Sequence, residues 1–441
     1  MNPPNRNVRA ASAIVISLAV AKLVFHLLIA NRYGIFRDEL YYLACSEHLG
    51  AGYVDQPPLI AFVTWIARHL FGESLIGLRL LPAVAGSVTV WLTGKLAREL
   101  GGGVFAQALA ALAVFAAPIF LLMHHLLTMN AFEPLVWIAC AWCIVRAIEH
   151  NEPRYWLWFG VLIGVGMENK YSTAFFAIAV VVALLLTPQR RFLASGWIWL
   201  GALCSLLIFL PNLTWLVRHD FPFLELMHNI RSTHRDVVRG PVAFIADQAM
   251  LMNPILFPLW VGGLCWLCLT RQGSRFRILG WTYVLLLVAF IVLKGKNYYL
   301  SAAYPMLFAA GAVAFENASR SRMSWSRPVY VTSVIVVSCL LAPLSVPVLS
   351  AENYVRYQNA LGLEPPKSEN QPTGPLPQHF ADEFGWEDMA REVGRVYNAL
   401  PPEQRAKTAI FANSYGQAGA IDFFGKKYGL PKAICNHQSY W

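Results

Sequence analysis

Eleven apolar runs follow one another through the first 348 residues of the chain. A hydrocarbon core about 30 Å thick needs roughly 20 apolar residues per helix, and a backbone in lipid must satisfy its own hydrogen bonds. We therefore expect an all-α polytopic membrane protein with about eleven transmembrane helices. The runs cover residues 10–30, 76–97, 104–123, 131–148, 155–167, 171–187, 194–217, 249–269, 278–293, 298–315 and 328–348.

The charge content agrees with this fold class and excludes several others. Charged residues make up 14% of the 441 residues, against roughly 25% in an average soluble chain. A disordered chain, a coiled coil, a disulfide scaffold and an ordinary cytosolic enzyme are therefore excluded. The net charge of +10 is spread between the apolar runs instead of forming one stripe, so we expect a lipid bilayer and no nucleic acid as partner.

Basic residues predict which connections share a side of the membrane. With a cytoplasmic N-terminus, every predicted inside loop carries Lys or Arg, as the positive-inside rule requires. An odd number of crossings then places the polar tail outside. The tail contains a strand-like segment and an apparent helix, which predict a small α/β domain over 349–441 beside a membrane domain over 1–348. The outside segments are 31–75, 124–130, 168–170, 218–248, 294–297 and the tail.

The first outside segment, 31–75, is much longer than a connection needs, and such loops are usually functional. Helical periodicity over 37–50 places Asp38 and Glu39 in a first turn, where the helix dipole favours carboxylates. The pair is therefore either a set of capping charges or a site of chemistry. A second interfacial helix is expected over 59–72.

The motifs of this loop resemble those of the polyprenyl-phosphate-sugar glycosyltransferases of the GT-C type. This family includes the protein O-mannosyltransferases and the aminoarabinose transferase that modifies lipid A. The similarity extends over most of the chain. The motifs are Asp38-Glu39, Tyr41-Tyr42, Asp55-x-Pro57-Pro58-Leu59, Asn169-Lys170-Tyr171-Ser172, Lys294-Gly295-Lys296-x-Tyr298-Tyr299 and Tyr304-Pro305.

The resemblance implies an inverting transfer from an undecaprenyl- or dolichyl-type monophosphate to a hydroxyl of a lipid, glycan or protein. It places the reaction on the periplasmic face of the cell inner membrane. It also implies that Asp38 is the general base, because an alcohol is a poor nucleophile at neutral pH. Glu39 is the neighbouring alternative.

The resemblance leaves the use of a metal open. The lipid A enzyme carries a metal-coordinating Glu at the position of Asp55, followed by a lysine where this chain has Gln56. A divalent metal is therefore possible, no cofactor is certain, and no metal ligands are assigned. Asp55 is either an active-site residue or a side chain that stabilises the turn before Pro57.

Two further groups of residues complete the expected site. Asn130, where relatives commonly have Asp, and Glu133 either cap the following helix or line the cavity. The departing phosphate requires cations near the outer interface, although lysines at helix ends also snorkel there. The candidate phosphate ligands are Lys170, Lys294, Lys296, Arg37, Arg231 and Arg235, and the tyrosines expected in the cavity are Tyr41, Tyr42, Tyr298 and Tyr299.

The alternative function is a transporter or flippase of lipid-linked sugars without transferase activity. The charges of Glu168 and Lys170, which interrupt an apolar stretch, favour it, because ionisable residues inside a membrane tend to be functional. The chain lacks an evident internal repeat, which is common among transporters, and has an oversized outer loop. These two features favour the transferase.

Overall fold

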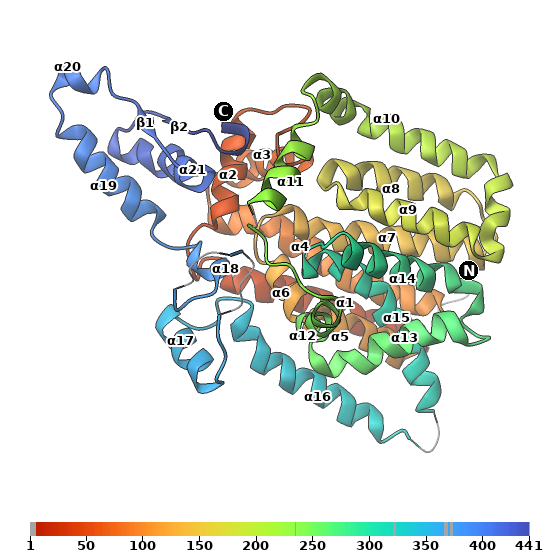
Figure 1. Cartoon of the computed structure of the whole chain (residues 1–441). Helices are drawn as coiled ribbons and strands as arrows, with labels where there is room; N and C mark the ends of the chain where they lie inside the picture. Colours follow the sequence, from red (N-terminus) through yellow and green to blue (C-terminus); the bar gives the residue numbers. More distant parts are fainter. Residues whose placement is uncertain (1–5, 234, 321–322, 366–368, 371–373, 441) are drawn as a thin grey trace.

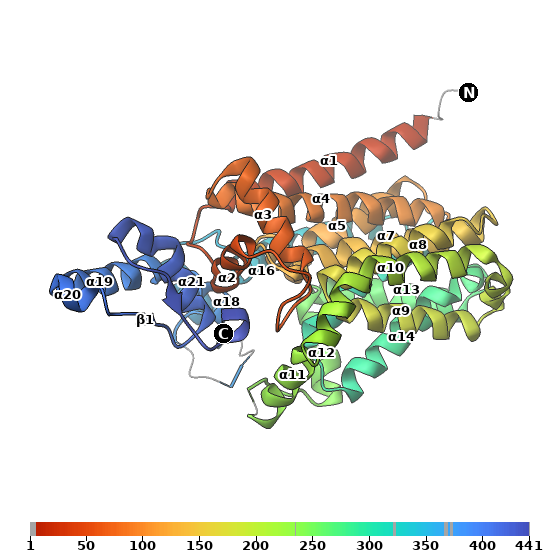
Figure 2. The same cartoon turned by 90° about the horizontal axis from the view of Figure 1, so that it is seen from above.

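The computed structural model describes residues 6–233, 235–320, 323–365, 369–370 and 374–440, and it is helical almost throughout. The helices up to residue 344 form one bundle, and the later elements lie at one end of it (Figures 1 and 2). The bundle consists of α1 (Arg6–Ile29), α2 (Arg37–Glu47), α3 (Leu59–Phe71), α4 (Leu75–Glu99), α5 (Val104–Ala116), α6 (Pro118–Met123), α7 (Met129–Glu149), α8 (Tyr155–Asn169), α9 (Ser172–Leu185), η1 (Pro188–Ala194), α10 (Gly196–Arg218), α11 (Pro222–Ser232), α12 (Pro241–Leu251), η2 (Pro254–Leu256), α13 (Phe257–Leu269), η3 (Ser274–Phe276), α14 (Arg277–Val292), η4 (Asn297–Ala303), α15 (Tyr304–Ala318), α16 (Ser326–Leu341) and η5 (Ala342–Leu344).

The protein is a multi-pass membrane protein. In its described part, seven helices are long and apolar enough to cross a bilayer, or nine if each of two bent helix pairs counts as one crossing. The run at 104–123 divides at Ala117, because Pro118 begins a new helix there, and the run at 155–167 forms a helix of 15 residues. The predicted number of eleven crossings therefore stays a prediction.

Glycine allows the tightest helix crossings of the bundle. A Cβ atom added to Gly160 on α8 would collide with the backbone of Gly201 on α10, and one added to Gly263 on α13 would collide with the backbone of α15. Small residues let helix backbones approach closely where lipid supplies no hydrophobic drive for association. These crossings hold together the helices from which the outer segments extend.

Outer segments that the charge pattern places on one side contact one another. The Leu127 N–H donates to Glu39, the Asn169 amide donates to the Met129 carbonyl, and the Gln248 amide donates to the Asn297 carbonyl. Segments predicted on the other side also pair, as Arg275 does with Glu149. The fold thus gathers the outer segments at one end of the bundle.

The outer loop and the tail pack together. The helix predicted over 37–50 is confirmed as α2, and that over 59–72 as α3. Helix α2 packs against both α3 and α21. The described tail contains α17 (Ala351–Ala360), α18 (Gln378–Ala381), α19 (Trp386–Asn398), α20 (Pro402–Arg405), β1 (Ile410–Phe411), α21 (Tyr415–Phe424), η6 (Gly425–Tyr428), β2 (Ala433–Ile434) and η7 (Gln438–Tyr440), with β1 and β2 paired in parallel.

Candidate active site

The two adjacent carboxylates of α2 have different environments. Glu39 is fully buried and accepts hydrogen bonds from the Phe36 N–H, at 2.9 Å, and from Arg79, with Nε 3.0 Å from Oε1. It therefore caps its own helix and is held in the protein interior. This placement favours the capping interpretation for Glu39 and leaves Asp38 as the carboxylate that faces open space.

Asp38 lies at the junction of α2 and the tail. Its side chain is 29% exposed, and its Oδ1 atom accepts a hydrogen bond of 2.7 Å from the Tyr415 hydroxyl on α21. The Arg37 Nε atom lies 3.6 Å from the same oxygen. A hydroxyl donor and a cation thus orient a carboxylate that remains partly exposed.

Arg79 on α4 holds this region together, and sequence reasoning did not single it out. It donates to Glu39, to the Gly34 carbonyl and to Glu383 of the tail. It also donates to the Ala30 carbonyl. The available signal was a lone arginine inside the apolar run at 76–97, because a charge in such a run needs a specific partner.

Asp55 is covered by the tail and by α2. The Tyr41 hydroxyl donates to its Oδ1 at 2.6 Å, and the Gln438 side-chain nitrogen, with the amide turned to donate, lies 3.1 Å from both oxygens. Burial raises the pKa of Asp55 to about 7, although the Tyr41 hydrogen bond acts in the opposite direction. Asp55 therefore holds a proton more tightly than an exposed carboxyl group does.

The surroundings of Asp55 do not form a metal site. Among the described residues, no group of three or more His, Cys, Asp or Glu side chains could hold a metal ion. Both Asp55 oxygens face uncharged hydrogen-bond donors, the Tyr41 hydroxyl and the Gln438 amide. Neither of these side chains adds an anionic ligand for a divalent cation. The residues present therefore do not fit the divalent metal that the resemblance left possible.

Lys170 lies at the centre of a second cluster on the membrane side. Its Nζ atom is 2.9 Å from Asn130 Oδ1 and 2.9 Å from Glu133 Oε2, and it lies 4.6 Å from the centre of the Tyr299 ring. The Ser172 hydroxyl also donates to Glu133. The structure thus brings Lys170 of the 168–170 segment together with Asn130 and Glu133, which lie at the end of the 124–130 segment and at the start of the next helix.

The capping interpretation of Asn130 is wrong. Helix α7 begins at Met129 and its N-cap is Thr128, so Asn130 already lies inside the first turn. Its side chain is free to reach Lys170 because the helix begins two residues earlier than a cap at 130 would require.

The other predicted cations are distributed around these two centres. Lys296 pairs with Asp236 at 3.2 Å, and Tyr298, which lies beside Lys170, is within electrostatic range of Asp38 and Asp236. Lys294 is exposed, and Arg231 lies in the last turn of α11, a helix with no buried residue. Lys296 therefore lies near Tyr299 and the Lys170 cluster, whereas the Lys294 side chain is open to solvent.

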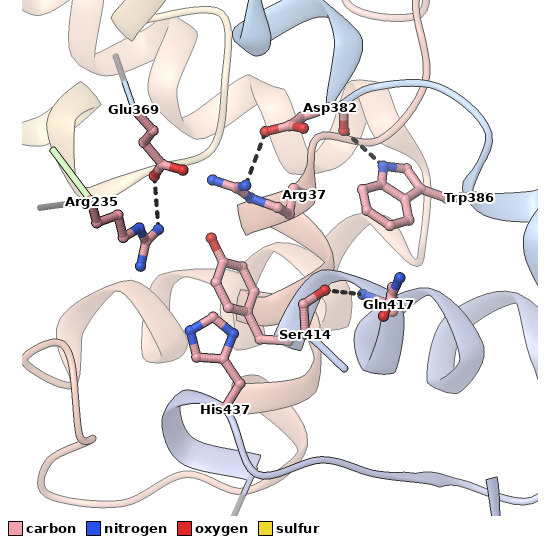
Figure 3. A pocket seen from close by; sticks show the side chains of 9 residues that line it. Arg37, Arg235, Glu369, Asp382, Trp386, Ser414, Gln417 and His437 are labelled. Atoms are coloured by element: carbon pink, nitrogen blue, oxygen red, sulfur yellow. Dashed lines mark hydrogen bonds and ion pairs between the residues drawn. The ribbon is translucent and has the colours of Figure 1, made fainter. Parts of the chain in front are cut away.

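A cavity of about 400 Å³ opens beside Asp38, between the outer loops and the tail (Figure 3). Arg37 and Arg235 point into it, each beside one carboxylate: Arg37 is 3.3 Å from Asp382, and Arg235 is 2.7 Å from Glu369. The lining residues are Arg37, Arg235, Glu369, Asp382, Trp386, Ser414, Tyr415, Gln417 and His437.

Comparison with solved structures identifies the architecture. ArnT from Cupriavidus metallidurans bound to undecaprenyl phosphate superposes with a TM-score of 0.63, at 16% identity, over 96% of this chain and 85% of that one. An oligosaccharyltransferase of Archaeoglobus fulgidus superposes with a TM-score of 0.56, at 14% identity, over 94% of this chain and 64% of that one. The chain has the GT-C fold. The fold class expected from the sequence is therefore confirmed.

Sequence comparison agrees with the motif resemblance. Residues 55–215 match the family described as dolichyl-phosphate-mannose-protein mannosyltransferase, and Asp38 lies before the matched region. The lipid A galacturonosyltransferase RgtD of Rhizobium johnstonii is 26% identical over 60% of this chain and 56% of its own length.

A second relative is an undecaprenyl phosphate-α-4-amino-4-deoxy-L-arabinose arabinosyl transferase of Pseudomonas fluorescens, 27% identical over 40% of this chain and 34% of its own. The chain thus spans between a third and just over half of the length of these two relatives. The resemblance to the polyprenyl-phosphate-sugar transferases is confirmed.

Proposed function

We propose that this chain transfers a hexosyl or pentosyl unit from a polyprenyl monophosphate to a hydroxyl of a lipid, glycan or protein. The observation that carries the proposal is Asp38, a partly exposed carboxylate oriented by Tyr415 and Arg37 and within electrostatic range of the tyrosine beside Lys170. Names of similar proteins support a lipid-linked donor, since one crystallised with undecaprenyl phosphate and another is a polyprenol-phosphate-mannose–protein mannosyltransferase of Corynebacterium glutamicum.

In the proposed reaction Asp38 accepts the proton of the acceptor hydroxyl as its oxygen attacks the anomeric carbon. The bond between that carbon and the phosphate oxygen breaks at the same time, and the phosphate departs with the electron pair. The configuration of the sugar is inverted. A base within hydrogen-bond reach contributes about 10²- to 10⁴-fold to such a step.

Lys170 and Lys296 are the proposed ligands of the departing phosphate. Each is held in place by an acidic partner, Glu133 or Asp236, so that its position is fixed before the donor binds. Preorganised cations stabilise developing negative charge without reorganisation during the reaction. Tyr298 and Tyr299 complete this side of the proposed site.

The proposed cellular arrangement follows from the basic inside loops. Residues 1–348 form the membrane catalytic domain, and residues 349–441 form a periplasmic domain that covers the site from outside the inner membrane. The hydrogen bond from Arg79 to Glu383 supports the position of the tail domain, because it joins the tail to the membrane domain at one end of the bundle.

The test uses purified full-length chain in lipid nanodiscs with radiolabelled undecaprenyl-phosphate sugars and a panel of acceptors. We expect transfer by the wild type, and loss of transfer with retained donor binding in Asp38→Asn. The exposed Asp388 supplies a matched control, since Asp388→Asn should keep full activity. Transfer at the wild-type rate in Asp38→Asn would exclude Asp38 as the base, and movement of the donor across the membrane of sealed proteoliposomes without transfer would favour a flippase.

A further inference from the structure

We propose that the cavity in Figure 3 binds a saccharide ring of the acceptor, so that the acceptor is a glycan or a glycolipid headgroup. This inference rests on the proposed transferase function and selects the glycan or the glycan part of a lipid among the acceptors named in that proposal. The argument starts from the chemistry of the cavity wall.

None of the described residues that line the cavity has an aliphatic side chain. Two arginines supply N–H donors, and Glu369 and Asp382 supply carboxylate acceptors. A sugar presents hydroxyl groups that both donate and accept at short intervals, so it requires both kinds of partner in one wall. Charged and polar side chains in one wall suit a hydroxylated ligand better than an acyl chain, because small-molecule sites for apolar ligands are lined mainly by hydrophobic side chains.

Aromatic rings supply the second feature of a sugar site. Trp386 points toward the cavity (Figure 3). His437 and Tyr415 also line the cavity, with their ring centres 5.1 Å apart. The Trp386 N–H donates to the Asp382 carbonyl, which fixes the orientation of the indole. A fixed aromatic ring offers an apolar face to the C–H face of a pyranose while its neighbours bind the hydroxyls.

Three polar atoms of the wall are buried and lack a hydrogen-bond partner within the described chain: Arg37 Nε, Glu369 Oε2 and Asp382 Oδ2. Arg37 Nε lies 3.6 Å from Asp38 and Asp382 Oδ2 lies 3.3 Å from Arg37 Nη1, so these two make ion pairs but no hydrogen bond. Leaving a buried donor or acceptor without a hydrogen bond is costly. One donor and two acceptors in the same wall match a ligand that carries hydroxyl groups.

The position of the cavity assigns it to the acceptor. Arg37 and Tyr415 line the cavity and also contact Asp38, and Tyr298, which packs against Lys170, lies within electrostatic range of the same carboxylate. An inverting displacement places the incoming oxygen and the departing phosphate on opposite faces of the anomeric carbon. With the phosphate at Lys170, the acceptor approaches from the cavity, so we assign Arg37 and Arg235 to the acceptor and not to the donor phosphate.

The test measures sugar binding without the transfer reaction. Full-length protein is placed in lipid nanodiscs, because maltoside detergents would compete for the site, and saturation-transfer NMR is recorded with methyl hexopyranosides. We expect transfer of saturation to the ring protons of at least one hexoside and none to a threonine tripeptide. Trp386→Ala and His437→Ala should each weaken binding at least fivefold, and Trp386→Phe should retain most of it.

Trp325, which is exposed and lies near the start of α16, supplies the control, and Trp325→Ala should bind as the wild type does. Absence of hexoside binding, equal binding of the tripeptide, or unchanged binding in both alanine variants would overturn the proposal. Binding of undecaprenyl phosphate is measured on the same samples. If the wild type does not bind undecaprenyl phosphate, the proposed transferase function is contradicted. If the wild type binds undecaprenyl phosphate but no hexoside, only the acceptor site is contradicted.

Discussion

The Nη2 atom of Arg79 lies 3.0 Å from the carboxylate of Glu383, which follows it by 304 positions, and both side chains are 1% exposed. The same guanidinium holds Glu39, the residue that follows the proposed base. One buried arginine therefore connects a membrane helix, the first turn of α2 and the tail. Removal of one partner from a buried ion pair leaves an uncompensated charge.

We expect Glu383→Ala to loosen the tail from the membrane domain. The contact between α2 and α21 should then open more often, so that amide hydrogens of α18 and α19 exchange faster and a protease cuts the tail sooner. Hydrogen exchange followed by mass spectrometry measures this directly. Glu387→Ala, which removes an exposed partner of Lys427, should leave the exchange unchanged. Equal exchange in both variants would show that Arg79 does not anchor the tail.

Tyr415→Phe should lower the turnover of the proposed reaction by about three- to tenfold, since it removes one hydrogen bond to the base. Donor binding should not change, because Tyr415 contacts Asp38 from the cavity side. Initial rates at saturating donor, together with a donor-binding isotherm, separate the two effects. Tyr397→Phe removes a hydroxyl that donates to the Arg405 carbonyl, far from α2, and should retain full turnover.

Lys170 and Glu133 should show strong thermodynamic coupling. Lys170→Met leaves Glu133 buried with its charge and is expected to cost about 3–5 kcal/mol, seen as a lower Tm in nanodiscs. The double variant with Glu133→Gln should recover part of that loss, which a double-mutant cycle measures. The exposed pair Lys427 and Glu387 should give a coupling of at most about 1 kcal/mol. If the stability losses of Lys170→Met and Glu133→Gln simply add in the double variant, the two side chains do not form a preorganised pair.

Asp55→Asn should reduce the pH dependence of stability. The pKa of Asp55 is raised to about 7 by burial, from an ordinary value of 3.8, so the folded protein binds this proton more tightly than the unfolded chain does. Its contribution to stability is complete below pH 4 and decreases as the pH rises to 7. Tm measured between pH 5 and pH 8 should fall less in Asp55→Asn than in the wild type. An unchanged slope would contradict a buried Asp55.

The periodicity and the motifs predicted the parts of the site that depend on local sequence. The 3.6-residue pattern placed Asp38 in the first turn of α2, and the polar break after Glu168 marked Lys170. The pairing of Lys170 with Asn130 and Glu133 required the helices α7 and α8 to lie side by side, which no local pattern specifies. Their common side of the membrane was the only available indication.

Contacts from the tail could not be predicted, because they join segments separated by hundreds of residues. Tyr415 follows Asp38 by 377 positions, and Ser439, whose N–H donates to Tyr41, follows that residue by 398. A tyrosine in a polar tail has no distinguishing neighbour in the sequence. Long-range pairing of this kind depends on how the tail docks, which the sequence pattern did not constrain.

The Arg79 connection has a practical consequence for protein engineering. Exchange of the tail between GT-C proteins, intended to alter acceptor choice, would replace Glu383 while keeping the arginine that it neutralises. Such a chimera would disturb the alignment of α2 even if both halves folded well. Compatible grafts would have to be selected first for an acidic residue opposite position 79, and only afterwards for the shape of the cavity.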